Sequence, residues 1–303
     1  MTIFLISFVF PINLSEIELK YEKSIIATIS KRVSRRAYDS KEIESSKLKK
    51  IRKILKNGFK GPFGGKSRFT LIDCVSTDTS EKQRLGTYGF IRGARYYILG
   101  ILDNDEQNIV DFGYSFEKII LKMTELELGT VWLGATFRYN QFKKCTKIKT
   151  SEYIAAVTPV GYSLEKPKVY EKIISWGIGA RKRKPWSKLF FLENLTDSLS
   201  ENEASKYATV LEMVRLAPSA RNEEPWRIVK EKDSNIYHIY LKLNRRFSDD
   251  SLPSMKQMDI GIAMSHFELT AKDQKLDGKW VKKNPNIDTN SKNLHYIASW
   301  IGK

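Results

Sequence analysis

Apolar residues recur with two different periods along this chain, and the two periods predict both helices and strands. Helical spacing of the apolar residues predicts helices over 14–32, 45–56, 112–128, 203–216 and 259–272. Ser15 can cap the first of these helices and Gly129 can end the long third one. Clusters of β-branched and aromatic residues predict strands at 68–75, 94–102 and 153–161, from 228 onward, and at 236–243. The Gly- and Pro-rich stretch 58–65 should interrupt regular structure. This order of elements predicts an α+β fold in which helices cover mixed sheets.

The chain also repeats itself at one fixed offset. Seven residue pairs that match in kind lie 148 positions apart: Arg35 and Arg183, Arg36 and Lys184, Tyr38 and Trp186, Asp111 and Asp259, Gly113 and Gly261, Leu128 and Leu276, Trp132 and Trp280. Coincidence is the alternative, but the pairs include Trp and Gly and need no gaps. We therefore expect two tandem, pseudo-symmetric halves, 14–180 and 181–303, after an apolar extension over 1–13. Related halves usually pack as a pair, so a site between them can draw on both.

The apolar start of the chain does not have the form of a membrane segment. Residues 1–11 are too short to span a bilayer, lack a positively charged n-region and precede no small-residue cleavage site. An extra strand, a poorly ordered extension or a mis-assigned start is expected there instead of a signal peptide. The sequence thus predicts a cytoplasmic protein without a membrane partner.

Charge and composition narrow the possible partners. The 303 residues carry a formal charge of +17, but lysines are spread through the chain and interleaved with acidic residues. No zinc-finger, basic-zipper or RNA-binding motif accompanies them, so a solvated basic surface is favoured over a nucleic-acid interface. Such a surface still attracts anionic cofactors. The three histidines have no metal-ligand spacing, and Cys74 and Cys145 are expected to be free thiols, so no metal is predicted.

The sharpest local motif is the segment 217–226, APSARNEEPW, between a predicted helix and a predicted strand. Pro218 stops the helix, and Ser219, Asn222 and the exposed backbone form a polar turn. Small polar side chains and free N–H groups suit a flat heterocycle with carbonyl and imide edges. A capped helix-to-strand turn without a ligand is the alternative interpretation of the same residues.

This segment resembles the APSxxNxQPW signature of the nitroreductase family, FMN-dependent enzymes that act as dimers. It departs from that signature at Glu224, where Gln is usual. Residues 32–38 (RVSRRAY) resemble the family's R-x-S-x-[RK]-x-[FY], and residues 128–137 (LGTVWLGATF) are similar to its flavin-facing turn. The resemblance extends over about residues 20–300. It is closest to the single-chain, duplicated branch of the family, which imitates the usual dimer.

The resemblance implies a site shared by the two halves. Arg32 and Ser34 would hold the phosphate, and Arg36 would lie near the N1/O2 edge of the flavin; alternate spacing in an extended segment places these three residues on one side. Backbone donors near N5 would come from the turn of Leu133, Gly134 and Ala135. The second half would add the loop residues Pro218, Ser219, Ala220 and Asn222. Arg181 and Arg183 belong to a basic run that is either a second phosphate contact or a solvated linker.

The resemblance implies an FMN-dependent NAD(P)H oxidoreductase with ping-pong turnover of small nitroaromatic or quinone-type acceptors. A flavin-binding storage or sensing protein with little turnover is the main alternative, and a nucleic-acid-binding protein is the weakest one. The second, symmetry-related cleft has Ala180, Lys182 and Lys184 where the first has Arg32, Ser34 and Arg36, and its loop lacks an Asn. We therefore expect one FMN per chain in a pseudo-dimeric protein that can function as a monomer.

Overall fold

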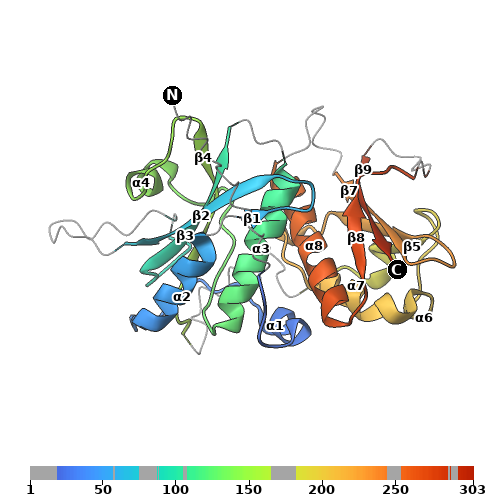
Figure 1. Cartoon of the computed structure of the whole chain (residues 1–303), viewed down its shortest axis with the longest axis horizontal. Helices are drawn as coiled ribbons and strands as arrows, with labels where there is room; N and C mark the ends of the chain where they lie inside the picture. Colours follow the sequence, from blue (N-terminus) through green and yellow to red (C-terminus); the bar gives the residue numbers. More distant parts are fainter. Residues whose placement is uncertain are drawn as a thin grey trace, which may run out of the picture.

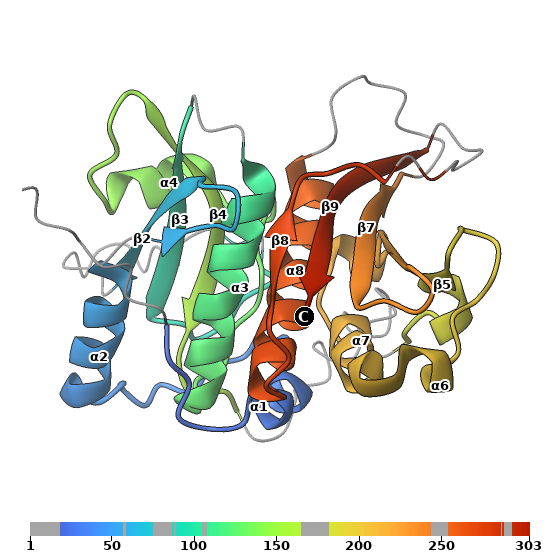
Figure 2. The same ribbon diagram turned by 45° about the vertical axis from the view of Figure 1, so that its right-hand side comes forward.

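The computed structural model describes residues 19–56, 59–74, 87, 89–104, 108–164, 182–243, 254–285, 287 and 293–303. Two long helices, α3 (Ile109–Glu125) and α8 (Ser254–Asp273), lie side by side at its centre (Figure 1). One sheet lies on the outer side of each helix, and the view turned by 45° shows the same arrangement (Figure 2). The predicted α+β fold is confirmed.

The first sheet has the order β1-β2-β3-β4, and its strand pairs are antiparallel. Its strands are β1 (Phe59–Lys60), β2 (Lys66–Asp73), β3 (Tyr96–Asp103) and β4 (Glu152–Val160). Helix α2 (Ser45–Lys56) packs against this sheet through its apolar side, which buries Leu48, Ile51 and Leu55. The short helix α4 (Tyr139–Lys144) lies between α3 and β4 in the sequence. Strand β1 corrects the expectation that 58–65 lacks regular structure.

The second sheet has the order β5-β6-β7-β9-β8 and is mixed, because β5 runs parallel to β6. Its strands are β5 (Phe190–Leu192), β6 (Trp226–Lys230), β7 (Ile236–Lys242), β8 (Gly278–Val281) and β9 (Leu294–Gly302). The single helix predicted over 203–216 is wrong. Ser205 has a left-handed φ of 51° that divides it into α6 (Glu201–Ala204), a 3-10 turn (Ser205–Tyr207) and α7 (Ala208–Arg215). Two further 3-10 turns cover Trp186–Lys188 and Ala220–Asn222.

The two central helices cross where each has a glycine. A Cβ atom added to Gly113 would lie 2.3 Å from the carbonyl oxygen of Met258, and one added to Gly261 would lie 2.0 Å from that of Val110. Both distances are far below contact, so the backbones approach more closely than any side chain allows. Met258 lies 148 positions after Val110, as Gly261 does after Gly113. The contact is therefore reciprocal, as in a two-fold interface.

The ends of α3 and α8 repeat the same geometry. Leu128 N donates to Met123 O at 2.9 Å, and Leu276 N donates to Ala271 O at 2.8 Å, again 148 positions apart. The preceding residues, Glu127 and Lys275, have left-handed φ values of 66° and 59°. Both ends are thus Schellman caps that lack the usual glycine, and Gly129 is not the cap predicted from the sequence. These equivalences support the inferred duplication. The predicted boundary between residues 180 and 181 lies outside the described residues.

Helix α1 (Ile25–Lys31) joins the two halves from below (Figures 1 and 2). Ile25 and Ile29 pack with Leu121 of α3 and with Met213 and Leu269 of the second half. Burying two isoleucines contributes about 1.5–3 kcal/mol each, which fixes the helix end against both halves.

The helix predicted over 14–32 is shorter than expected. Residues 19–24 precede it and are not helical, Ser24 accepts a hydrogen bond from Ala27 N at its start, and the expected cap Ser15 lies outside the described residues.

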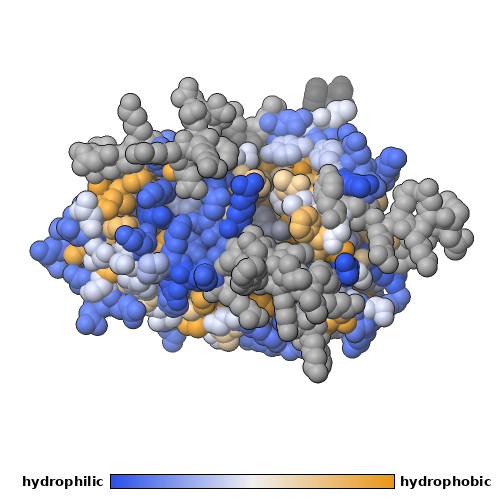
Figure 3. Space-filling view, turned by 180° about the vertical axis from the view of Figure 1, so that it is seen from behind, coloured by the Kyte–Doolittle hydropathy of each residue, from blue (hydrophilic) through white to orange (hydrophobic). Residues whose placement is uncertain are grey.

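Seen from behind, hydrophilic residues predominate and the hydrophobic areas between them are small and separate (Figure 3). Among the described helices, none is long and apolar enough to cross a membrane. Cys74 and Cys145 are both free thiols, as expected.

Candidate functional site

The basic segment after α1 is fixed along the turn that follows α3. Arg32 caps α1, and its backbone N–H donates to Thr28 O and Ile29 O. The chain then runs extended: Ser34 forms a parallel bridge with Thr130, and Arg35 N donates to Thr130 O at 2.8 Å. Arg32 is buried and Ser34 is half-buried. The helix end therefore determines where the first predicted phosphate arginine lies.

The three predicted side chains are less exposed than Val33, but burial does not alternate along the segment. Arg32 is buried and Ser34 and Arg36 are half-buried, whereas Val33 is 46% exposed; Arg35 is half-buried as well. Arg36 also accepts a backbone bond from Arg92 N at 2.9 Å, which fixes its main chain. The expected position of Arg36 at the flavin edge stays a prediction.

The predicted N5 turn adjoins the second half. Leu133 is buried and exchanges two backbone hydrogen bonds of 2.9 Å with Val157, so the turn begins from a fixed residue. A Cβ atom on Gly134 would lie 3.5 Å from the Sδ of Met255, the second residue of α8. Ala135 is exposed. The turn thus presents main chain beside α8.

The loop 217–226 comes from the second half and is held in an unusual conformation. Three of its residues, Arg221, Asn222 and Glu224, have left-handed φ values of 54°, 56° and 43°. Ser219 Oγ accepts a hydrogen bond from Glu224 N at 2.9 Å. Such conformations cost free energy and persist only where surrounding contacts enforce them. Specific contacts therefore enforce the conformation of this loop, which is more than a capped helix end.

Asp259 of α8 anchors this loop. Its Oδ1 accepts a hydrogen bond of 2.8 Å from Ala220 N. Burial raises the pKa of the Asp259 carboxyl to about 7, although the Ala220 N–H and Lys256 both act to lower it. Asp111 has the equivalent role in the first half, where it accepts from Gly65 N at 2.7 Å and from Phe63 N at 3.2 Å. Each central helix thus holds a loop that leads into a strand, β2 in the first half and β6 in the second.

Arg183 joins the basic run to this loop. Its Nη2 donates to Leu216 O at 3.1 Å and its Nη1 donates to the side-chain oxygen of Asn222. Burial lowers the pKa of the Arg183 guanidinium, and Glu224 partly opposes this effect. The charge of Arg32 lowers it further, so the two guanidinium groups lie within electrostatic reach. Arg181 lies outside the described residues.

Glu224, the departure from the family signature, lies in a compensated position. It is fully buried, its Oε2 accepts from Lys184 N at 2.9 Å, and its Oε1 lies 3.7 Å from Arg183 Nη1. Burial lowers the pKa of Arg227 to about 10, and the Glu224 charge partly restores it. The carboxylate therefore serves cations that a glutamine would not pair. Lys184 and Arg183 are both partly buried, so this part of the run is not a solvated linker.

The second cleft, defined by the loop 61–65 and Lys282, differs in its chemistry. Lys282 lies 148 positions after Gly134. Its Nζ lies 4.6 Å from the centre of the Phe63 ring and 3.4 Å from Asn108 Oδ1. A long cationic side chain thus occupies the position at which the first cleft has a glycine. An open hollow of about 410 Å³ remains there, lined in part by Gln257 and Lys282.

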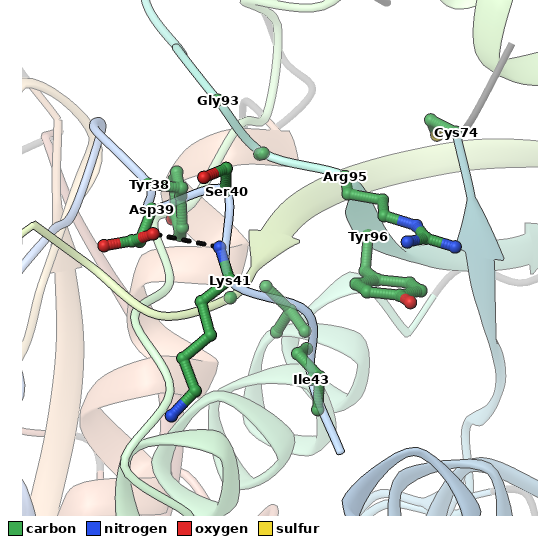
Figure 4. A pocket seen from close by; sticks show the side chains of 12 residues that line it. Tyr38, Asp39, Ser40, Lys41, Ile43, Cys74, Gly93, Arg95 and Tyr96 are labelled. Carbon is green, nitrogen blue, oxygen red and sulfur yellow. Dashed lines mark hydrogen bonds between the residues drawn. The ribbon is translucent and has the colours of Figure 1, made fainter. Parts of the chain in front are cut away.

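A separate cavity of about 280 Å³ lies in the first half (Figure 4). Tyr38, Lys41, Arg95 and Tyr96 line it, and Lys41 N donates to Asp39 at 2.9 Å. It includes none of the residues predicted to bind FMN.

Several residues that shape the site were not predicted from the sequence. Glu117 and His266, both fully buried, lie between α3 and α8 beside Arg32. Trp132 and Asp259 were visible as members of the repeat but had no assigned role. Among the described residues, no group of His, Cys, Asp and Glu could hold a metal ion.

A family model described as "Putative TM nitroreductase" matches residues 24–271. The chain belongs to this nitroreductase family. A "putative nitroreductase" from Thermotoga maritima has a similar fold: at 20% identity it aligns over 93% of this chain and 95% of its own, with a TM-score of 0.56. Membership makes the chain a nitroreductase-like oxidoreductase, and the predicted family is confirmed.

Two other solved structures match about half of the chain. An FMN-dependent nitroreductase from Clostridium difficile is 22% identical and aligns over 47% of this chain and 90% of its own, with a TM-score of 0.38. A Bacteroides fragilis nitroreductase with bound FMN is 17% identical and aligns over 48% and 92%, with a TM-score of 0.37. No curated protein matches the chain.

Proposed function

We propose that the chain binds one FMN between its halves and uses NAD(P)H to reduce small nitroaromatic or quinone-type acceptors by a ping-pong cycle. Family membership supports the reaction class. The observation that supports the cofactor best is the buried Nε of Arg32, which has no hydrogen-bond partner among the described residues. The charge of Arg183, from the second half, acts on the same region.

Arg32 provides the best test of whether a phosphate fits. Its side chain is 6% exposed, and within the described part of the chain its Nε has no hydrogen-bond partner. A buried donor without an acceptor costs about 1–3 kcal/mol. A phosphate oxygen would supply that acceptor, and the half-buried hydroxyl of Ser34 lies two residues along the same segment. The basic segment therefore fits a phosphate group.

The loop 217–226 fits the ring end of the cofactor in a limited way. Asn222 uses its side-chain oxygen for Arg183 and donates its amide to Lys182 O at 2.7 Å. Its contribution would therefore be to fix the loop. Ser219 accepts one bond and still has a hydroxyl proton to donate. Main-chain donors at the Gly134 turn would face the ring from the other half.

Hydride transfer is the chemistry that a bound flavin supplies, so the chain needs no catalytic triad. Its own residues would neutralise the phosphate through Arg32 and Arg183 and orient the ring between two fixed loops. Arg36 would stabilise negative charge on the reduced ring. The chain's contribution is binding, orientation and electrostatics.

One site per chain follows from the difference between the clefts. The second cleft has Lys282 over the Phe63 ring where the first has Gly134 beside Met255. A flavin in the second cleft would have to displace that lysine and would find no counterpart of Asn222 in the loop 61–65.

The test is a visible absorption spectrum of the purified protein, before and after anaerobic NADPH or NADH addition. Flavin absorbance at about one FMN per chain that bleaches within seconds is the expected result. Flavin that stays oxidised would support the storage or sensing alternative. A colourless protein that takes up no FMN would refute the site. Lys282→Ala should leave the stoichiometry unchanged, because the loop 61–65 of the second cleft still has no counterpart of Asn222. Arg32→Gln should lower FMN occupancy.

A further inference from the structure

A buried carboxylate lies directly behind the predicted phosphate arginine. Glu117, in the middle of α3, is fully buried, and its Oε1 lies 3.9 Å from Arg32 Nε. Its Oε2 accepts a hydrogen bond of 2.7 Å from Trp132 Nε1. The same Oε1 lies 3.0 Å from Nε2 of His266, a residue of α8 in the other half. One carboxylate thus contacts Arg32, the turn after α3 and the second half.

The hydrogen bonds of His266 hold its ring from both sides. Its Nε2 lies 3.0 Å from Glu117 Oε1, and its Nδ1 lies 2.8 Å from Met213 O, a backbone carbonyl of the second half. A carbonyl only accepts, so Nδ1 donates to it. The ring therefore links the Glu117 carboxyl to the main chain of the second half.

We propose that Glu117 is a positioning residue of the phosphate site, fixed from the second half by His266. This inference rests on the proposed function. Arg32 cannot remain buried without a counter-charge, since an uncompensated buried cation is costly. The Glu117 carboxylate provides that counter-charge and holds the guanidinium toward the contact between α3 and α8. From there Arg32 lies within electrostatic reach of Arg183. Without the carboxylate, Arg32 would turn toward water.

Glu117→Gln separates position from charge. The variant keeps the shape of the side chain but removes the negative charge that faces the Arg32 guanidinium. Loss of a negative charge beside the site would by itself favour a phosphate. Weaker FMN binding by the variant would therefore report a change in where the Arg32 guanidinium lies.

The readout is the preference for FMN over riboflavin, which lacks the phosphate. Dissociation constants for both flavins are measured by flavin fluorescence titration of wild type, Glu117→Gln, Arg32→Gln and the double variant. We expect Glu117→Gln to weaken FMN about tenfold or more, as for the loss of one charged hydrogen bond, and riboflavin much less. Arg32→Gln should lose the same preference, and the double variant should lose no more than Arg32→Gln alone.

A matched control is available in the second half. His238 is also buried and lies 2.9 Å from Glu231 through Nε2, but its other nitrogen meets the hydroxyl of Ser299. Glu231→Gln therefore alters a histidine–carboxyl pair away from Arg32 and should leave both constants unchanged. Glu117→Asp keeps the carboxylate and should restore part of the FMN preference, and it replaces Glu117→Gln in the test if the latter does not fold.

The outcomes separate the two proposals. A wild-type chain that binds neither flavin would overturn the proposed function and this inference with it. A wild type that prefers FMN, with a Glu117→Gln variant that keeps the preference, would overturn the inference alone. Equal weakening of both flavins would also overturn it, because it would show that Glu117 supports only the fold.

Discussion

Asp259 gives a prediction that depends on a single buried carboxyl. Its side chain is 4% exposed, and its pKa is raised to about 7, chiefly by burial. In the described residues its Oδ2 has no hydrogen-bond partner, while its Oδ1 holds Ala220 N of the loop. Asp259→Asn keeps the shape and the acceptor for Ala220 but removes the titration.

The sign and size of the pH effect on the free energy of unfolding follow from proton linkage. The folded pKa is about 7, against 3.8 for an ordinary aspartate, so the folded state binds the proton more tightly. The free energy of unfolding should therefore fall as pH rises from about 4 to about 7 and level off above that. Each pKa unit corresponds to ~1.4 kcal/mol, which gives about 4 kcal/mol over the whole window. Asp259→Asn should lack this loss.

Urea unfolding of both proteins at intervals between pH 5 and pH 8 measures the effect. The free energy of unfolding of Asp259→Asn relative to wild type should rise with pH through this range. Other titrating groups are shared and cancel in the difference. Asp277→Asn, whose carboxylate is exposed, is the control and should give a constant difference. Parallel curves for wild type and Asp259→Asn would refute the assigned pKa.

Two further substitutions test the contact between α3 and α8 and the loop 217–226. Gly261→Ala should destabilise the protein by about 1–3 kcal/mol, because the new Cβ would lie 2.0 Å from Val110 O. The gain in helix propensity offsets only about 1 kcal/mol of this cost. An unchanged melting temperature would contradict the close crossing of the two helices. Glu224→Gln should also destabilise, by ~1–3 kcal/mol, since it removes the buried counter-charge of Arg183, whose other contacts are hydrogen bonds to uncharged groups. Denaturant unfolding would show the opposite sign if the family's usual glutamine is also the better residue here.

The long elements were predictable because their periodic signal is long. The third predicted helix, 112–128, corresponds to α3 at 109–125, and the strand predicted at 153–161 corresponds to β4 at 152–160. Short elements such as β1 and β5 have too few residues for a period to appear. For the helix predicted over 14–32, the predicted start was wrong. Ile25 and Ile29 do form its apolar side, but the pattern of apolar residues does not show that the helix begins only after Ser24.

Helix ends and left-handed backbone conformations were harder to predict from the sequence. Gly129 was the obvious cap, yet the left-handed residue is Glu127, a residue type with no preference for that conformation. Tertiary contacts override such local preferences, and a single sequence does not display them. The same holds for Ser205, which divides a well-patterned helix.

For the candidate site, sequence motifs identified the segments but not the contacts between them. Arg32, Arg183 and the loop 217–226 were chosen by resemblance, and the structure joins Arg183 to the loop through Asn222. Glu117 was missed for a physical reason. A polar residue on an amphipathic helix is normally assigned to the solvent side, whereas α3 is covered on one side by its sheet and on the other by α8, so that its Glu117 is interior.

The close crossing of α3 and α8 links the fold to the proposed site. Gly113 and Gly261 allow the two helix backbones to touch, and this approach lets Glu117 of one helix reach His266 of the other. Arg32 then lies against a carboxylate held by both halves. The proposed phosphate site would therefore exist only when the halves are docked. Occupation of the site should in turn stabilise that docking, because a ligand that binds only the assembled form shifts the folding equilibrium toward it.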